Sequence, residues 1–395
     1  MMAAADKQPF AVIAKPVGSR CNLRCRYCYY LEKGKYSTHE VQNRMSNNLL
    51  ERLIRQTIET SPGPVVSFTW HGGEPSLAGL EFYEKAVYFE KRYLPRGWQV
   101  WNNLQTNGTL LNEEWCRFIR DNRFDVGVSI DGTELVHDRN RLDIGGHPTY
   151  SKVTESIKRL QKYGINPDLL CTVTSDSAEN PKDTYRALRD LGTEWIQFIP
   201  VIVRLPDGTM SRESVTPEAY GRFLCEIFDE WVVNDLGKTD VQLFAETSKV
   251  WVGGEPSLCW MTGTCGRVLV VEEDGGIYSC DHFVDSEHRL GTLPSTRLED
   301  ALNSEFQIRF GQSKRDALTR QCRECPHLDA CGGGCLKDRF AQSEDGEDGM
   351  YYLCKGLRMF FDHARPVLER VMELSREGND PAAIMNKLRK ERADG

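Results

Sequence analysis

The stretch Cys21-Asn22-Leu23-Arg24-Cys25-Arg26-Tyr27-Cys28 places three cysteines in one short segment, with three and then two residues between them. Disulfides use cysteines in pairs, and a closed structural zinc site takes four protein ligands. A four-iron cluster held by only three thiolates keeps one iron open for an external ligand. The spacing therefore favours a reactive iron–sulfur cluster on this loop over a cluster that only transfers electrons.

A repeated strand–helix pattern surrounds this stretch and occupies residues 9–235. Short apolar runs alternate with segments whose apolar residues recur at helical spacing. The predicted strands are Phe10–Lys15, Val65–His71, Gln99–Gln105, Asp125–Asp131, Asp168–Val173 and Trp195–Pro200. The predicted helices are Met45–Thr60, Leu80–Tyr93, Asn112–Arg120, Tyr150–Tyr163, Pro181–Leu191 and Ala219–Val233. Consecutive strand–helix units predict a parallel sheet with crossover helices.

The six predicted units are two fewer than those of a closed eightfold barrel, so we expect an α/β fold built as a partial (β/α)6 TIM-type barrel. In such folds the chemistry lies at the carboxyl ends of the strands. Four loop features follow predicted strands: Gly72-Gly73-Glu74-Pro75, Gln105–Gly108, Ser129–Gly132 and, further on, Arg141. From the residues alone, the glycines also suit a tight turn, Ser129 a helix N-cap and Arg141 a solvated charge.

The overall composition is that of a water-soluble globular protein of 395 residues with a net charge of −8. No basic segment marks a nucleic-acid partner, and no apolar run is long enough for a membrane span or a signal peptide. We therefore expect a cytoplasmic protein with neither kind of partner. Disulfides rarely persist in that compartment, so the fourteen cysteines indicate metal or redox chemistry.

The C-terminal third carries a second concentration of cysteines. They are Cys259, Cys265, Cys280, Cys322, Cys325, Cys331, Cys335 and Cys354, enough for two four-cysteine sites. The pair Cys322-Arg-Glu-Cys325 suits zinc and iron–sulfur clusters equally, so ligand count alone leaves both open. A hairpin with its turn at Asp274-Gly275-Gly276 is predicted just before Cys280.

These motifs together resemble a known family. The three-cysteine loop is similar to the signature of the radical S-adenosylmethionine (radical SAM) enzymes. The later cysteines resemble the SPASM extension of that superfamily. Over residues 15–354 the chain resembles the anaerobic sulfatase-maturating enzymes, with matches at Lys15-Pro16, Gly72–Pro75, Leu104–Leu110, Ser129–Gly132 and Tyr278–Asp281. The implied domains are a radical SAM partial barrel (8–237), a SPASM domain with two auxiliary clusters (238–370), and a C-terminal helix and tail (371–395).

The resemblance implies three [4Fe-4S] clusters and S-adenosylmethionine as cofactors. Cys21, Cys25 and Cys28 correspond to the ligands of the first cluster. One auxiliary cluster is assigned to Cys259, Cys265, Cys280 and Cys335, and the other to Cys322, Cys325, Cys331 and Cys354. The positions that correspond to the family's contacts with S-adenosylmethionine are Tyr27, Gly73, Ser129, Arg141 and Ile202. His71 stands where some relatives have glutamine.

The implied reaction oxidises a cysteine or serine side chain of a sulfatase to Cα-formylglycine and cleaves S-adenosylmethionine to methionine and 5′-deoxyadenosine. Asp281 corresponds to the catalytic base that takes the proton from the substrate's S–H or O–H. A carboxylate next to a cluster ligand lies in a partly desolvated place, which favours proton uptake. Two other interpretations remain open: Asp281 caps the turn, or His282 is the base.

The implied partners are a sulfatase with a Cys/Ser-x-Pro-x-Arg motif and an external electron donor such as flavodoxin or ferredoxin. One alternative is a SPASM enzyme that crosslinks or epimerises a ribosomally made peptide. Many of those carry an N-terminal recognition domain, for which a barrel starting by residue 10 leaves no room. A non-catalytic zinc or iron–sulfur scaffold is another alternative. About twelve irons, against two zinc ions, would distinguish the enzyme from a zinc scaffold.

Overall fold

A computed structural model describes residues 7–30 and 44–394, and it divides into two compact units that interleave along the sequence. Unit 1 comprises the described residues up to Ser129, together with Arg141–Pro167 and Thr264–Ser313. Unit 2 comprises Ile130–Asn140, Asp168–Gly263 and the described residues from Lys314 onward. The sequence domains expected at 8–237, 238–370 and 371–395 stay a prediction.

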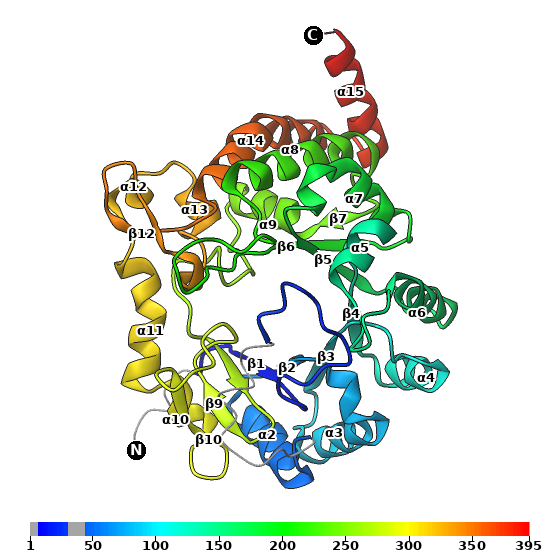
Figure 1. Ribbon diagram of the computed structural model, residues 1–395, viewed down its shortest axis with the longest axis vertical. Helices are drawn as coiled ribbons and strands as arrows, with labels where there is room; N and C mark the ends of the chain where they lie inside the picture. The colour runs from blue at the N-terminus through cyan, green and yellow to red at the C-terminus, as the bar shows by residue number, and fades with distance from the viewer. Residues whose placement is uncertain (1–6, 31–43, 395) are drawn as a thin grey trace. The chain divides into compact units, whose positions relative to one another are not determined.

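The strands of unit 1 form a continuous sheet in the order β10-β9-β8-β1-β2-β3-β4 (Figure 1). Their bounds are β1 Ala11–Ala14, β2 Val65–Trp70, β3 Gln99–Thr106, β4 Asp125–Ser129, β8 Val268–Val271, β9 Gly276–Tyr278 and β10 Arg289–Thr292. Strands β1 to β4 pair in parallel, whereas β8-β9-β10 is an antiparallel meander. The predicted hairpin before Cys280 is therefore confirmed as β8–β9.

The meander adds to the edge of the parallel strands, which the sequence did not predict. Strand β8 pairs with β1 in parallel, with Ala14 opposite Val271. The pairing continues one residue further, because the Lys15 amide donates to the Val271 carbonyl at 2.9 Å. Lys15 and Glu272 are the first residues after this pair of strands. They therefore lie side by side at the carboxyl edge of the sheet.

The helices of unit 1 follow their strands closely. They are α2 Asn47–Thr60, α3 Leu80–Tyr93, α4 Glu113–Asn122, α6 Tyr150–Lys162, α10 Leu298–Leu302 and the first part of α11 Glu305–Asp316. Helix α2 begins after Ser46, whose side chain accepts from the Leu49 amide. Asn112 caps α4 in the same way, with bonds from Glu114 and Trp115. These caps account for the one- or two-residue differences from the predicted starts.

Unit 2 contains the parallel strands β5 Asp168–Val173, β6 Trp195–Pro200 and β7 Asp240–Val241. Its longer helices are α7 Pro181–Arg189, α8 Pro217–Asn234, α9 Gln242–Trp251, α14 Cys354–Arg376 and α15 Pro381–Asp394. Its shorter elements are α5 Glu134–Asn140, α12 Arg320–Arg323, α13 Leu328–Cys331, β11 Ala341–Gln342 and β12 Asp348–Met350. Helix α8 starts two residues earlier than predicted, because Thr216 caps it and Pro217 occupies its first turn.

Close packing of α8 against α14 depends on two glycines. A Cβ on Gly356 would lie 2.2 Å from the Pro217 carbonyl oxygen, and one on Gly221 would lie 2.8 Å from the Gly356 carbonyl oxygen. The aromatic rings of Phe228, Phe244 and Phe360 pack beside this crossing. The start of α14 is thereby fixed, and its first residue is the predicted cluster ligand Cys354.

The alternation of parallel strands and helices confirms the predicted α/β class. Over residues 7–30 and 44–394, no helix is both long and apolar enough to cross a lipid bilayer.

Candidate active site

The three-cysteine loop of unit 1 is held by backbone bonds to the segment after Arg141. The Arg24 amide donates to the Leu142 carbonyl at 2.7 Å, and the Ile144 amide donates to the Asn22 carbonyl at 3.3 Å. Cys21 accepts from the Leu23 amide at 3.3 Å and from Asn107 Nδ2 at 3.7 Å. Burial nevertheless raises the pKa of its thiol to about 11. Donors aimed at a buried sulfur suit a thiolate that binds a metal cluster.

The Gly72-Gly73-Glu74 turn packs directly against the backbone that leads into this loop. The Gly73 amide donates to the Gly18 carbonyl, and the Glu74 amide donates to the Arg20 carbonyl, both at 2.8 Å. A Cβ on Gly73 would lie 2.1 Å from the Arg20 carbonyl oxygen. The absence of a side chain at Gly73 therefore allows the backbone before the cysteine loop to pack directly against this turn.

Glu74 is fully buried and organises the next strand end. Its carboxylate accepts from Ser76, from Thr106 Oγ1 at 2.7 Å and from the Asn107 amide at 2.7 Å. Burial raises its pKa, although these hydrogen bonds oppose the shift. The ends of β2 and β3 are thus fixed to each other beside the cysteine loop.

The predicted contacts with S-adenosylmethionine fall mainly in unit 1. The Arg141 guanidinium lies over the Tyr27 ring at 5.5 Å, and Arg141 is only 7% exposed. Ser129 Oγ accepts from Gln105 Nε2 at 3.1 Å. Ile202 belongs to unit 2, where its carbonyl accepts from Lys337 Nζ at 3.2 Å. The structure thus brings Tyr27 and Arg141 together, and the cofactor contacts themselves stay predictions.

Asp281 lies in a dense polar network within unit 1. Its Oδ1 is 2.7 Å from Lys15 Nζ, and its Oδ2 accepts from the hydroxyl groups of Tyr29 at 2.5 Å and Tyr30 at 2.8 Å. The hydroxyl of Tyr30 also lies 3.2 Å from His71 Nδ1. Three donors stabilise the ionised form of a carboxylate. The network therefore fixes the orientation of the Asp281 carboxylate.

Lys15 connects Asp281 to a second carboxylate. Its side chain is fully buried, and Nζ lies 2.8 Å from Glu272 Oε1. Burial alone would lower the pKa of Lys15, but the two carboxylates outweigh it and hold the pKa above its usual value. Burial raises the pKa of Glu272 to about 7, against the opposing effect of Lys15. Lys15 thus stays an ammonium, and Glu272 is the group here whose charge changes near neutral pH.

The sequence interpretation missed four members of this network: Lys15 as the ion-pair partner of Asp281, Glu272 as the second partner of Lys15, and Tyr29 and Tyr30 as donors to Asp281. The sequence did contain a signal for two of these residues. Lys15 and Glu272 are charged residues placed directly after buried strands, where functional side chains are expected. The two tyrosines follow Cys28 immediately. His282, the alternative base, is exposed, and its ring lies 5.7 Å from that of Tyr29.

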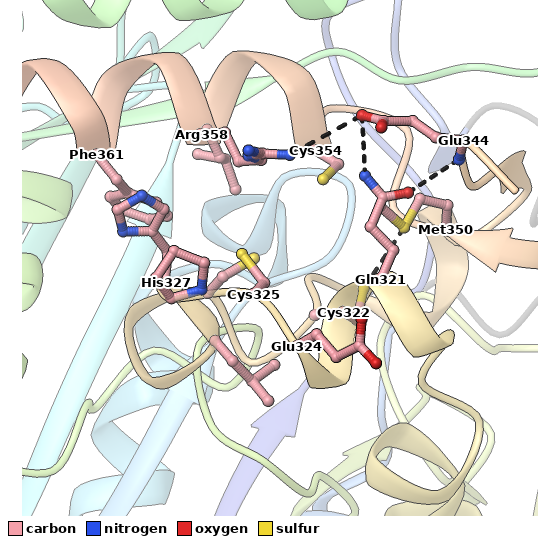
Figure 2. Close-up of a pocket in the computed structure, with 15 residues that line it drawn as sticks. Gln321, Cys322, Glu324, Cys325, His327, Glu344, Met350, Cys354, Arg358 and Phe361 are labelled. Carbon is pink, nitrogen blue, oxygen red and sulfur yellow. Dashed lines mark hydrogen bonds and ion pairs between the residues drawn. The ribbon is translucent and has the colours of Figure 1, made fainter.

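The predicted cluster site at Cys322, Cys325, Cys331 and Cys354 is a cavity of about 210 Å³ within unit 2. All four cysteines line it, together with Met350, His327 and Phe361 (Figure 2). Cys322 donates to Met350 Sδ at 3.5 Å. Burial raises the pKa of Cys331 to about 12 and that of Cys354 to about 11. The structure brings these four predicted ligands together.

Four cysteines around one cavity suit the four thiolate ligands of an iron–sulfur cluster.

The other predicted auxiliary ligands divide between the units. Cys265 and Cys280 belong to unit 1, whereas Cys259 and Cys335 belong to unit 2. Burial raises the pKa of Cys335 to about 11, and the nearby Asp338 and Cys259 add to the effect. Two of the four predicted ligands are therefore neighbours within unit 2. The ligation of the whole set stays a prediction.

Family models match both halves of the chain. The Radical SAM superfamily model matches residues 16–193, and the SPASM model, described as an iron-sulfur cluster-binding domain, matches residues 259–326. The first match contains the three-cysteine loop. The second contains Cys259, Cys265, Cys280, Cys322 and Cys325, and it ends before Cys331.

Full-length relatives are similar as well. The chain is 41% identical to a serine-type anaerobic sulfatase-maturating enzyme of Bacteroides thetaiotaomicron, over 97% of this chain and 96% of that protein. It is 32% identical to a cysteine-type enzyme of Clostridium perfringens, over 92% of this chain and 98% of the relative.

Solved structures agree with these relatives. The structure of anSMEcpe with bound AdoMet and the Cp18Cys peptide matches with a TM-score of 0.83 and 32% identity, covering 92% of this chain and 99% of that one. The structure of SuiB from Streptococcus suis matches with a TM-score of 0.60 at 14% identity, which supports the fold alone. The predicted fold class, a partial barrel followed by a SPASM domain, is confirmed by the family models and the first structure.

Proposed function

Because this chain belongs to the anaerobic sulfatase-maturating enzymes of the radical SAM superfamily, we propose that it oxidises a cysteine or serine side chain of a sulfatase to Cα-formylglycine. The observation that carries the proposal is the network at Asp281, an anion fixed by Lys15, Tyr29 and Tyr30 in the same unit as the three-cysteine loop. A scaffold that only bound peptides would have no use for a partly buried carboxylate held by an ammonium and two hydroxyl groups there.

The cofactors of the proposal are S-adenosylmethionine and three [4Fe-4S] clusters. When bound, the cluster at Cys21, Cys25 and Cys28 and S-adenosylmethionine supply a carbon-centred radical that removes a hydrogen atom from the substrate's Cβ. Tyr27, Gly73, Ser129, Arg141 and Ile202 are the proposed contacts for S-adenosylmethionine. Arg141 is the strongest of these candidates, because a buried guanidinium beside Tyr27 suits a carboxylate ligand.

The proposed role of Asp281 is to accept the proton of the substrate's S–H or O–H. Lys15 keeps the carboxylate ionised, and the two tyrosine hydroxyls fix its orientation. A general base of this kind contributes about 10²–10⁴-fold to a rate. Lys15 therefore has the role of a positioning residue, and Asp281 is the residue that contacts the substrate.

The proposed partners are a sulfatase peptide of the form Cys-x-Pro-x-Arg or Ser-x-Pro-x-Arg and an external one-electron donor such as flavodoxin or ferredoxin. We place the reaction in the cytoplasm. Eleven of the fourteen cysteines are proposed cluster ligands. Cysteines used for metal clusters in place of disulfides are characteristic of a reducing compartment.

The test uses the reduced, iron-loaded enzyme with S-adenosylmethionine and the two peptides. The expected product from the serine peptide has lost two hydrogens. The expected product from the cysteine peptide has also exchanged sulfur for oxygen. Mass spectrometry measures both products, and 5′-deoxyadenosine is quantified in the same sample. The matched control, Cys21→Ala/Cys25→Ala/Cys28→Ala, should form neither product while keeping the auxiliary iron. Unmodified peptides from a fully loaded wild-type enzyme would contradict the proposal.

A further inference from the structure

A second fully buried lysine, Lys314, lies near the end of α11 and belongs to unit 2. Its Nζ donates to the carbonyl oxygens of Cys259 and Trp260 at 2.9 Å each, and to that of Thr262. An ammonium group has three N–H donors, so these three carbonyls can satisfy it completely. The segment 259–262 is thus folded around a positive charge.

Cys259, the first residue of that segment, is a proposed cluster ligand. The residue is exposed as a whole, but its sulfur lies in a crowded environment. Burial raises the pKa of the thiol, and the positive charge of Lys314 opposes this rise. The charge of Lys314 therefore acts on the sulfur through space, in addition to fixing the backbone beside it.

The neighbouring loop between Cys331 and Cys335 is organised in the same way by Arg339. The guanidinium donates to the carbonyls of Gly333 at 2.8 Å and Gly332 at 3.0 Å, and also to the carbonyl of Lys314. A Cβ on Gly332 would lie 2.3 Å from the Met261 carbonyl oxygen. The two cysteine-bearing loops consequently pack backbone to backbone, with the buried Lys314 holding one loop and the partly buried Arg339 holding the other.

We propose that Lys314 raises the reduction potential of the auxiliary cluster bound at Cys259, by placing a fixed positive charge beside one of its thiolates. The inference rests on the proposed ligation of a cluster by Cys259. A cluster with four thiolates gains negative charge on reduction, so a nearby positive charge stabilises the reduced form. Low dielectric makes that effect larger in the protein interior than at the surface. Arg339 has the separate role of holding the Gly332–Gly334 loop.

The test measures midpoint potentials by redox titration followed with electron paramagnetic resonance. The background is the full chain carrying Cys21→Ala/Cys25→Ala/Cys28→Ala, so that only auxiliary clusters give signals. Lys314→Gln keeps amide N–H donors for the carbonyls and removes the charge. We expect one auxiliary signal to shift to lower potential and the other to stay unchanged. Arg315→Gln, which removes an exposed charge from the next residue, is the matched control and should leave both signals unchanged.

Iron content is measured on every sample. If Lys314→Gln loses iron, Lys314→Met and Lys314→Arg are compared, since arginine keeps the positive charge and methionine removes it. A lower midpoint potential in Lys314→Met alone supports the proposal. An unchanged midpoint in a neutral variant with wild-type iron content would overturn it, as would loss of iron in all three variants. The readout does not depend on peptide oxidation. A failed proposed function would leave the potential shift in place, and a failed inference would leave formylglycine formation in place.

Discussion

Lys15 and Lys314 are both fully buried, yet their surroundings differ in kind. Lys15 lies between the carboxylates of Asp281 and Glu272, whereas Lys314 donates to three backbone carbonyls. Carboxylates gain and lose protons, and carbonyls do not. The comparison teaches that one buried lysine is paired with groups that exchange protons, whereas the other is held by backbone groups that do not.

The largest effect is expected from removing Asp281, the carboxylate partner of Lys15 that is proposed to accept the substrate's proton. We expect Asp281→Asn to lower formylglycine formation by about 10²–10⁴-fold, because an amide cannot accept the substrate proton. 5′-Deoxyadenosine should still form, and the measurement is the ratio of the two products. Asp285→Asn, four residues further along, is the control, because that carboxylate binds His288. A wild-type ratio with full iron content would remove Asp281 from the mechanism and favour the capping interpretation.

The next test removes the cation itself. Lys15→Met leaves two partly buried carboxylates without their shared ammonium; breaking a fully buried ion pair costs about 3–5 kcal/mol of unfolding free energy, which is the upper bound here. We expect a lower denaturation midpoint and a reduced formylglycine to 5′-deoxyadenosine ratio. Lys85→Met removes an exposed lysine that pairs with Glu81, and it should change neither quantity appreciably. A Lys15→Met variant with wild-type stability and ratio would mean that Lys15 does not position Asp281.

Arg141 is a third buried cation, and it differs from the two lysines because its proposed partner is a bound ligand. Arg141→Ala should weaken the binding of S-adenosylmethionine by about 10- to 100-fold, the equivalent of a charged hydrogen bond of about 1.5–3 kcal/mol. Calorimetry measures the dissociation constant directly. Arg139→Ala, which removes an exposed guanidinium paired with Asp176, is the matched control. The structure already excludes the alternative of a solvated charge, because Arg141 is buried; equal constants for Arg141→Ala and the wild type would mean that it does not bind the cofactor.

The smallest expected effect is the pH dependence at Glu272. Its pKa in the folded protein is about 7, above the ordinary value of 4.5. A raised carboxyl pKa means that the folded state holds the proton more tightly than the unfolded chain. The protonated Glu272 side chain therefore stabilises the folded state at low pH, and this stabilisation is lost as the pH rises through about 7. Glu272 faces Lys15, Glu273 and Asp281, so these groups modulate the effect.

The measurement compares thermal midpoints at pH 5.5 and pH 8. We expect Glu272→Gln to lose less stability than the wild type over this interval, by about 1–3 kcal/mol. Glu273→Gln, at the adjacent residue, should keep most of the wild-type pH dependence, because Glu272 is still present and Glu273 is only a minor cause of its raised pKa. An identical pH dependence in Glu272→Gln and the wild type would show that Glu272 does not titrate near neutrality. Asp281 would then be the one remaining carboxylate that distinguishes the surroundings of Lys15 from those of Lys314.

Much of the fold follows from local pattern. The strands at Asp168–Val173 and Trp195–Pro200 and the helix at Leu80–Tyr93 have their predicted bounds, because buried strands and amphipathic helices are encoded in short periodic windows. The cysteine positions were equally visible, since spacing along the chain identifies a ligand loop. The cavity at Cys322, Cys325, Cys331 and Cys354 also agrees with the expected grouping.

The contacts that build the site depend on pairing between distant segments. Lys15 meets Glu272 only because β8 joins β1, and a short apolar run such as Val268–Val271 does not reveal its partner strand. Tyr29 and Tyr30 were invisible for a similar reason, because their hydroxyl groups meet Asp281 about 250 residues further along the chain. Sequence patterns specify elements, and register between elements requires the three-dimensional structure.

The pairing of β8 with β1 also has a consequence for biosynthesis. Strand β1 leaves the ribosome before β8, and one of its edges stays open until a partner 257 residues away has been made. At about 5–20 residues per second, that interval lasts roughly 10–50 s. An unpaired strand edge is a site for pairing with other chains. We expect nascent chains that end before Val268 to need a chaperone, because this edge can close only after β8 has been made.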